Sequence, residues 1–150
     1  MHKKEKLLGD ILVKKGVITQ EQLKAALTAQ KMSKEFLGTI LIERRLIEEG
    51  DLLDALSLQY KISFISLTHR YIDWSFVKKF DASLIFDYKC FPVSKDDGST
   101  TMAITNPLDA WVLKKAEDES RGSQVNFVLV TMKDMDEVIE RYREYIKGHL

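Results

Sequence analysis

The chain has 150 residues, of which 45% are hydrophobic and 31% charged, so it holds enough apolar material for a folded core. Its 23 basic and 23 acidic side chains cancel, so no global field attracts nucleic acid or an anionic membrane. The single cysteine, Cys90, excludes an internal disulfide, and no segment approaches the ~20 apolar residues of a membrane span. Because no long apolar stretch follows the basic start, a signal peptide is not expected, and we predict a cytoplasmic protein.

The first half of the chain contains a repeat. Residues 8–30 recur imperfectly as residues 37–59, with nine identities in 23 aligned positions, where unrelated stretches would share about one or two. Each copy reads as a short helix, a turn and a longer helix whose apolar residues recur at helical spacing. The repeat therefore predicts one supersecondary unit used twice.

The two copies differ at their turns. In the first copy, Gly16 is a predicted helix stop, and Thr19 and Gln22 have the spacing of a capping box at the start of the next helix. The second copy carries Arg45 and Glu48 at the positions of Gly16 and Thr19. A non-glycine residue at the helix stop adds bulk and a steric penalty if the backbone there needs a positive φ.

After the repeats, the sequence alternates between strand and helix patterns. Residues 64–67 indicate a short extended segment, and Asp73 is a plausible cap for a short helix. Two predicted strands, Lys89 to Ser94 and Thr100 to Thr105, flank an Asp-Gly turn that favours a hairpin.

The remaining elements are a helix, a strand and a helix. Asn106 as cap, with Pro107 at the first helical position, predicts a helix that ends near residues 121–122. Val125 to Val130 forms the next strand, and Thr131 caps the last helix, with Asp134 at the capping-box position. We therefore predict an α+β fold: a duplicated helix-turn-helix bundle in residues 1–62, followed by a small three-stranded α/β sandwich in residues 63–150.

No catalytic constellation is visible in the sequence. The three histidines, His2, His69 and His149, are scattered, and one cysteine with these histidines gives no metal-ligand spacing. The seven glycines never form a phosphate-loop pattern. Cys90 lies in an apolar run, which favours a buried structural thiol over a nucleophile. We predict that the chain is not an enzyme and binds no metal.

The repeat pattern resembles the N-terminal (MshEN-type) domain of type II secretion and type IV pilus assembly ATPases. That family carries two tandem motifs of the form Arg-Leu-Gly, then leucine, glycine, leucine, leucine and a final glutamine, separated by a five-residue spacer. Residues 31–35 form a spacer of this length. The resemblance covers residues 6–146 and includes the later segments 64–67, 91–93 and 102–109.

The resemblance implies one of two roles. The first is a non-catalytic docking module that joins the motor ATPase to the cytoplasmic domain of the inner-membrane platform, with the motor domain in cis or in trans. The second is a receptor for cyclic di-GMP, a two-fold symmetric dinucleotide; the resemblance implies no other cofactor. The ligand positions implied for that role are Leu8, Gly9, Leu12, Gly16, Leu27, Gln30, Leu37, Gly38, Leu41, Arg45, Leu56 and Gln59.

The chain departs from the ligand-binding pattern at the head of each motif. In the binding members an arginine stands there, whereas this chain has Leu7 and Phe36. A planar guanidinium can stack on a guanine and meet a phosphate, which an apolar side chain does not do. Losing two charge-assisted bonds weakens binding by about two to four decades, although Arg45 or Lys6 would supply a charge and Phe36 a stacking ring. We therefore favour docking, with the protein cytoplasmic and peripheral to the inner membrane through its partners, without contact to a nucleic acid polymer or direct membrane insertion. A third hypothesis is a freestanding dimer that regulates a motor ATPase in trans.

Overall fold

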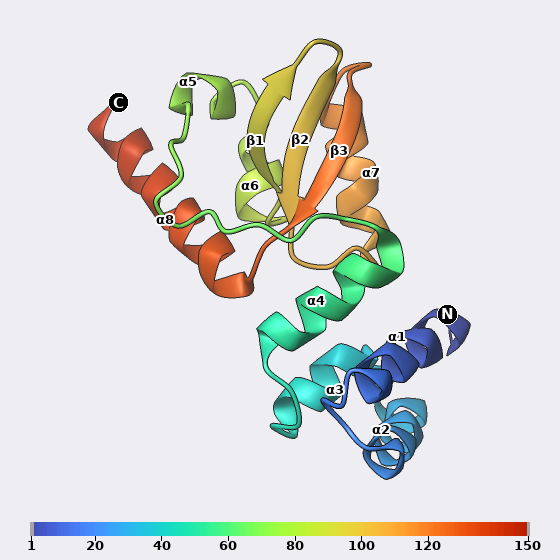
Figure 1. The fold of residues 1–150 in the computed structure, drawn as a ribbon. Helices are drawn as coiled ribbons and strands as arrows, with labels where there is room; N and C mark the ends of the chain where they lie inside the picture. Colours follow the sequence, from blue (N-terminus) through green and yellow to red (C-terminus); the bar gives the residue numbers. More distant parts are fainter. Residues whose placement is uncertain (1, 150) are drawn as a thin grey trace. The chain divides into compact units, whose positions relative to one another are not determined.

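The computed structural model of the chain describes residues 2–149 and divides them into two compact units, one up to Lys61 and one from Ile62 onward. The first unit is helical and contains α1 (His2–Lys14), α2 (Gln20–Ser33), α3 (Leu37–Glu43) and α4 (Glu49–Tyr60) (Figure 1). Helix α1 packs on α2 and α4, and α2 packs on α3. The first copy begins within α1, at residue 8, so each copy of the repeat supplies a short helical segment followed by a longer helix.

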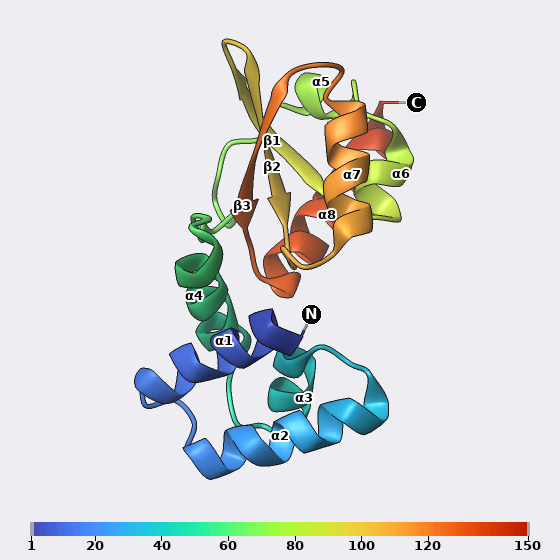
Figure 2. The same cartoon turned by 90° about the vertical axis from the view of Figure 1, so that its right-hand side faces the viewer.

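The second unit is a small α/β structure. It contains α5 (Trp74–Val77), α6 (Ala82–Phe86), β1 (Phe91–Asp96), β2 (Ser99–Ile104), α7 (Ala110–Glu119), β3 (Gln124–Leu129) and α8 (Met132–Gly148). The strand order is β1-β2-β3, with β1 antiparallel and β3 parallel to β2. A parallel pair needs a crossover connection, which α7 provides beside the sheet (Figure 2).

The core of the second unit joins one face of the sheet to α8. Ala103 of β2 and Phe91 of β1 pack with Met135, Val138 and other α8 side chains that are buried. Trp74 stacks on Tyr142 with ring centroids 5.8 Å apart, which ties the segment around α5 to the same helix. Burial of apolar area, at about 25 cal/mol per Å², therefore holds α8 and α5 to the sheet.

The predicted extended segment lies beside β3. The Ile65 N–H donates to the Leu129 carbonyl (2.9 Å), and the Leu129 N–H donates to the Ser63 carbonyl (2.8 Å). These bonds form one parallel bridge between Phe64 and Leu129. The segment therefore covers part of an edge strand that would otherwise present unpaired backbone groups.

Two predictions for the second unit are wrong in detail. The helix predicted to begin at Asn106 and Pro107 begins at Ala110, because Asp109 is its cap and accepts from the N–H groups of Trp111 and Val112. The Asn106 side chain instead accepts from the Leu108 N–H within a turn. Helix α6 is not predicted at all, and β1 begins two residues later than expected, at Phe91.

Candidate functional site in the duplicated helical unit

The two Leu-Gly pairs place a glycine where helices meet closely. A Cβ atom added at Gly9 would lie 2.3 Å from Cδ1 of Leu23, and one added at Gly38 would lie 2.7 Å from Cδ2 of Leu52. Leu23 and Leu52 are also equivalent positions of the two copies. Neither glycine has a positive φ, so close approach between the two helices of each copy is the reason for glycine here.

The turns that end α1 and α3 have the same geometry. The N–H of Gly16 donates to the Val13 carbonyl, and the N–H of Val17 donates to the Leu12 carbonyl, which is the hydrogen-bond pattern of a Schellman motif. The second copy repeats both bonds one period later, at residues 42–45 and 41–46. Gly16 has a φ of 77° and Arg45 a φ of 58°. Arg45 therefore occupies a left-handed position that costs an L-residue about 1–2 kcal/mol.

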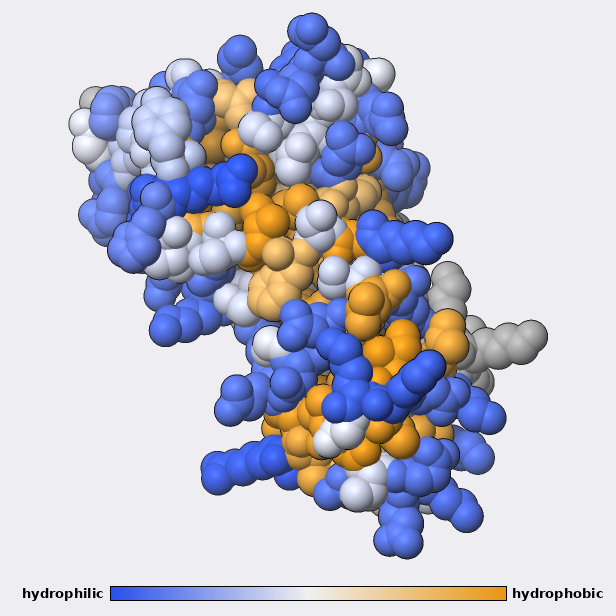
Figure 3. All heavy atoms as spheres, viewed as in Figure 1, coloured by the Kyte–Doolittle hydropathy of each residue, from blue (hydrophilic) through white to orange (hydrophobic). Residues whose placement is uncertain are grey.

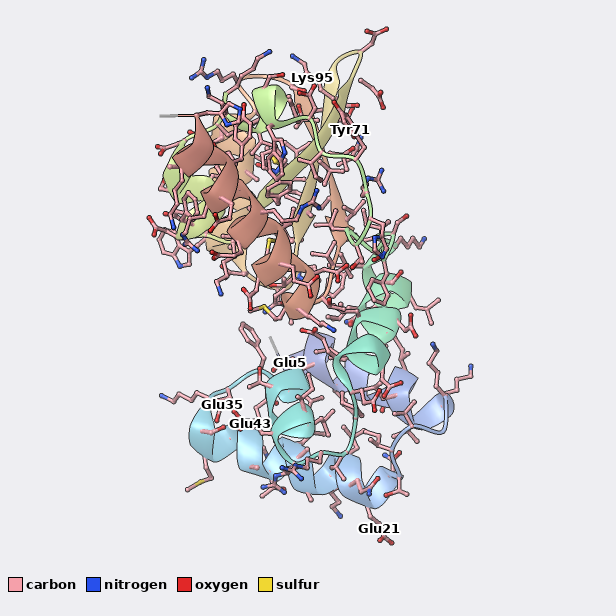
Figure 4. The ribbon with its side chains drawn as sticks, turned by 90° about the vertical axis from the view of Figure 1, so that its left-hand side faces the viewer. Glu5, Glu21, Glu35, Glu43, Tyr71 and Lys95 are labelled. Atoms are coloured by element: carbon pink, nitrogen blue, oxygen red, sulfur yellow. The ribbon has the colours of Figure 1, made fainter. Side chains whose placement is uncertain are left out.

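A buried polar network joins three helices of the unit. The Glu5 side chain on α1 is 2% exposed and accepts hydrogen bonds from the Gln30 amide on α2 and from the Leu37 N–H at the start of α3 (3.2 Å). The Gln30 amide nitrogen also donates to the Glu35 carbonyl (3.1 Å). Figure 4 marks Glu5 and Glu35 in this unit. Because both donors of the Gln30 amide are used inside the protein, Gln30 has a structural role that needs no ligand.

Tyr60 on α4 belongs to the same neighbourhood. Its hydroxyl is buried and has no hydrogen-bond partner among the residues that the structure describes. Burial, and after it the negative charge of Glu5, raises the pKa of Tyr60 above its ordinary value. The Tyr60 phenol therefore stays protonated at neutral pH.

The structure places most of the predicted ligand positions in the core. The leucines at positions 8, 12, 37, 41 and 56 are at most 3% exposed, and Gly9 and Gly38 are buried beneath leucine side chains. Leu27 and Gln59 are half-buried, while Gly16 and Arg45 are exposed at the two turns. The leucines of the motif therefore serve packing, and of the predicted set only the turn residues are open to solvent.

Exposed apolar side chains lie at the heads of both motifs. Leu7 is 52% exposed and Phe36 is 36% exposed, and these positions are equivalent in the two copies. Met32 and Leu58 of the same unit are also largely exposed, at 86% and 60%. Figure 3 shows apolar side chains gathered on the face of this unit over α1, α3 and α4. Tyr71, Trp111 and Met132 are exposed in the second unit, so what distinguishes the first unit is that two of its exposed apolar side chains occupy equivalent positions of the repeat. An exposed apolar side chain becomes part of an interaction surface when it lies in a contiguous patch.

The structure offers no sign of metal or thiol chemistry within residues 2–149. No group of three or more His, Cys, Asp or Glu is placed to hold a metal ion in that range. Cys90 is fully buried, and burial raises the pKa of its thiol to about 12, so the thiol stays protonated and unreactive at neutral pH. Of the described helices, none is both long enough and apolar enough to cross a membrane.

Comparison with known proteins identifies the fold. A family model described as the MshEN domain matches residues 56–149. The chain belongs to the MshEN domain family. This MshEN domain is 27% identical over 135 residues to the type IV pilus assembly ATPase PilB of Myxococcus xanthus, over 90% of this chain and 24% of that protein. It is also 27% identical over 139 residues to PilB of Thermus thermophilus, over 92% of this chain and 15% of that protein. The chain thus spans about a quarter or less of these curated relatives.

Solved structures share the fold. A structure of MshE with cdg superposes with a TM-score of 0.82 and 25% identity, over 90% of this chain and 97% of that one. The N-terminal domain of XpsE matches with a TM-score of 0.70 and 16% identity, over 92% and 94% of the two chains, which concerns the fold alone. These matches confirm the resemblance and the α+β fold class inferred from the sequence. Together with the PilB matches, they show that this chain resembles a domain found within type IV pilus assembly ATPases.

Sequence reasoning missed Glu5. Its signal was weak, because a single acid between Lys4 and Lys6 in a charged N-terminal stretch reads as solvated surface. Only the fold shows that its carboxylate meets the Gln30 amide and the start of α3.

Proposed function

We propose that this MshEN domain is the non-catalytic N-terminal docking and regulatory domain of a type II secretion or type IV pilus assembly ATPase. Its partner is the cytoplasmic domain of the inner-membrane platform protein, which places the domain in the cytoplasm at the membrane. The observation that carries this proposal is the exposed apolar pair Leu7 and Phe36 at the heads of the two motifs.

Three features support docking over ligand binding. The motif glycines are explained by close packing on Leu23 and Leu52, and the Gln30 amide is satisfied inside the unit. An exposed leucine and phenylalanine at equivalent positions suit a protein surface, where apolar and aromatic anchors carry most of the binding energy. The same two side chains have no charge to offer a phosphate.

The test is a calorimetric titration of the chain with the cytoplasmic domain of the platform protein. We expect Leu7→Glu with Phe36→Glu to weaken binding by at least about 30-fold, because a charged group would be buried at each anchor. The matched control is Trp111→Glu, which changes a side chain that is 76% exposed in the other unit. Equal affinity of the double variant and the wild type would refute docking through this surface, provided circular dichroism shows both to be folded.

Cyclic di-GMP binding is the second candidate function. It is supported by the similarity to the structure of MshE with cdg, taking cdg to be cyclic di-GMP, and by the exposed cation of Arg45. In this candidate the residues named above for the two motifs form the site.

A gain-of-function pair tests this candidate. Replacing Leu7→Arg and Phe36→Arg restores the family's motif heads, and each arginine is expected to raise the affinity for cyclic di-GMP by about 10- to 100-fold. Calorimetry and thermal shift at roughly 100 µM dinucleotide would detect a dissociation constant near 10 µM. If neither the wild type nor the arginine variant binds, the dinucleotide is not the ligand of this unit.

A further inference from the structure

A surface cavity in the second unit has a lining that the proposed function does not use. It has a volume of about 490 Å³, within the range of small-molecule sites. The tip of the β1–β2 hairpin, the segment after α5 and the connection from α7 to β3 form its walls. Lys95 and Thr100 lie opposite each other in the ladder and therefore on the same side of the hairpin; Figure 4 marks Lys95.

The cavity carries an excess of positive charge. Lys79, Lys95 and Arg121 line it against one acidic residue, Glu119. The Glu119 carboxylate already accepts from the Asp81 N–H (2.9 Å) and lies 4.0 Å from Lys115. Among residues 2–149, neither Lys95 nor Arg121 forms an ion pair. Two cations beside one cavity without carboxylate partners favour an anionic occupant.

Backbone and hydroxyl groups add hydrogen-bonding capacity at the same wall. Ser120 is right-handed and its N–H donates to carbonyls of α7, whereas Arg121 and Gly122 follow with φ values of 52° and 88°, so the N–H groups of residues 121 and 122 leave the helical hydrogen-bond pattern. Within the described part of the chain, neither the Arg121 N–H nor the Gly122 N–H donates a hydrogen bond. The Thr100 and Ser123 hydroxyls lie 3.0 Å apart at the base.

The segment from α5 onward adds aromatic side chains to the lining. Phe76 and Phe80 line the cavity as half-buried rings in an edge-to-face pair, with centroids 5.2 Å apart. Aromatic rings and cations in one lining favour a ring-bearing anion over a bare one, because the ligand's ring can bury against the phenyl groups while its anionic group binds the cations. A second cavity of this unit, about 410 Å³ next to α8, has no such bias, since Arg70 and Arg141 are balanced there by Asp134 and Glu137. A third, at the hairpin tip, is lined by Lys95 with Asp96 and Asp97 and has no aromatic wall.

We infer that the cavity between the hairpin tip, Phe76, Phe80 and Arg121 binds a small phosphorylated molecule with a planar ring, of the class of nucleoside monophosphates. The phosphate meets Lys95, Arg121 and the N–H groups of residues 121–122, and the ring lies against the two phenylalanines. The residues of this site belong to the second unit and the motifs to the first, so the outcome of this test is independent of the docking and cyclic di-GMP proposals.

The test is a titration of the ¹⁵N-labelled full chain with AMP, followed by amide chemical shifts. AMP is added to about 5 mM, which reveals a dissociation constant near 1 mM. We expect shifts confined to the amides around residues 76–80, 95–100 and 119–123. Inorganic phosphate and adenosine, which are the two parts of AMP, are each expected to bind at least about tenfold more weakly than AMP. The affinity for AMP should also fall as the salt concentration rises.

Single substitutions test which side chains bind the phosphate. Lys95→Ala and Arg121→Gln are each expected to weaken AMP binding about tenfold, because each removes a charge-assisted hydrogen bond. Lys114→Ala is the matched control: Lys114 is 71% exposed on α7 and pairs with Asp118 outside the cavity. Absence of shifts at the highest concentration, shifts elsewhere in the chain, or equal losses in the control variant would overturn the site. Equal affinity for phosphate and AMP would overturn the ring-bearing class.

Discussion

At the scale of single residues, the two motif glycines show how the repeat constrains side-chain size. Gly9→Ala would place a methyl group 2.3 Å from Cδ1 and 3.2 Å from Cγ of Leu23, whose side chain is 1% exposed and has little room to move. Overpacking costs about 1–3 kcal/mol, more than the roughly 1 kcal/mol that alanine gains over glycine in a helix. We expect Gly9→Ala to lower the free energy of unfolding by about 1–2 kcal/mol in urea denaturation.

Gly50 provides the matched control for that measurement. It lies in α4, and a Cβ added there meets nothing within 4 Å. Gly50→Ala should therefore stabilise the chain by up to about 1 kcal/mol. The packing explanation fails if Gly9→Ala and Gly50→Ala change stability in the same direction.

Asp134 is a second residue whose role depends on a distant segment. Its carboxylate accepts from the Leu67 N–H (2.8 Å) and from the Ser66 and Thr68 hydroxyls (3.1 Å each). Partial burial acts to raise its pKa, but these hydrogen bonds outweigh it and hold the pKa below the ordinary value. We expect Asp134→Asn to cost about 1–2 kcal/mol at pH 7, allowing for its partial exposure.

The pH dependence of that cost follows from the lowered pKa. The contribution is complete above the unfolded-state pKa, near ~4, and is lost as the pH falls through the lower folded-state pKa. The stability difference between wild type and Asp134→Asn, measured in urea at pH 7 and near pH 2, should therefore shrink in acid. Asp118→Asn, at an exposed residue of α7, is the control and should show a small difference at both values. A difference for Asp134→Asn that is unchanged in acid would contradict this account.

Helix-capping patterns in the sequence predict the roles of Thr131 and Asp134 at the start of α8, but they do not predict the hydrogen-bond partners of the Asp134 carboxylate. Thr131 caps α8, as predicted, and accepts from the Asp134 N–H (3.0 Å). The Asp134 carboxylate reaches residues 66–68 instead of completing a local capping box. Glu5 is the same kind of case, because its partners are 25 and 32 positions away. Spacing reveals contacts within a helical turn, whereas contacts across the fold need the fold itself.

At the scale of elements, the turn between α3 and α4 is the weaker of two equivalent turns. Arg45 has the positive φ that Gly16 adopts in the first copy. Arg45→Gly removes the steric cost of about 1–2 kcal/mol but adds backbone entropy to the unfolded chain, so we expect a net stabilisation of about 0.5–1 kcal/mol. The reciprocal variant, Gly16→Arg, should destabilise by a similar amount. Thermal unfolding of the two single variants checks both signs, and matching signs would show that the turns are not equivalent.

Elements that carry a strong local sequence signal are predictable. Elements whose start depends on which of two possible caps is used, or that are too short to show a period, are not. The capping box of Thr19 and Gln22 and the Asp-Gly hairpin are present as predicted. The start of α7 was misplaced because two caps compete there, Asn106 and Asp109, and the later one begins the helix. Helix α6 has only five residues, too few for an apolar period to appear in the sequence.

At the scale of the whole molecule, the family match and the repeat cover largely different parts of the chain and overlap only at residues 56–59. The matched region, residues 56–149, is mostly the second unit, whereas the duplicated motifs lie in the first. The second unit has its own buried core and sheet, which is what independent folding requires. We therefore propose that the predicted boundary near residues 62–63 marks the start of a domain that folds on its own.

We expect a fragment of residues 62–150 to fold cooperatively alone, with a free energy of unfolding within about 1 kcal/mol of the corresponding transition in the full chain. A fragment of residues 68–150 is the sharper comparison. It lacks Leu67, which is 2% exposed, and the segment whose backbone pairs with Leu129. Losing one buried leucine and that pairing should cost about 3–5 kcal/mol. If both fragments are unfolded by near-ultraviolet circular dichroism, the second unit depends on the first and the proposed boundary is wrong.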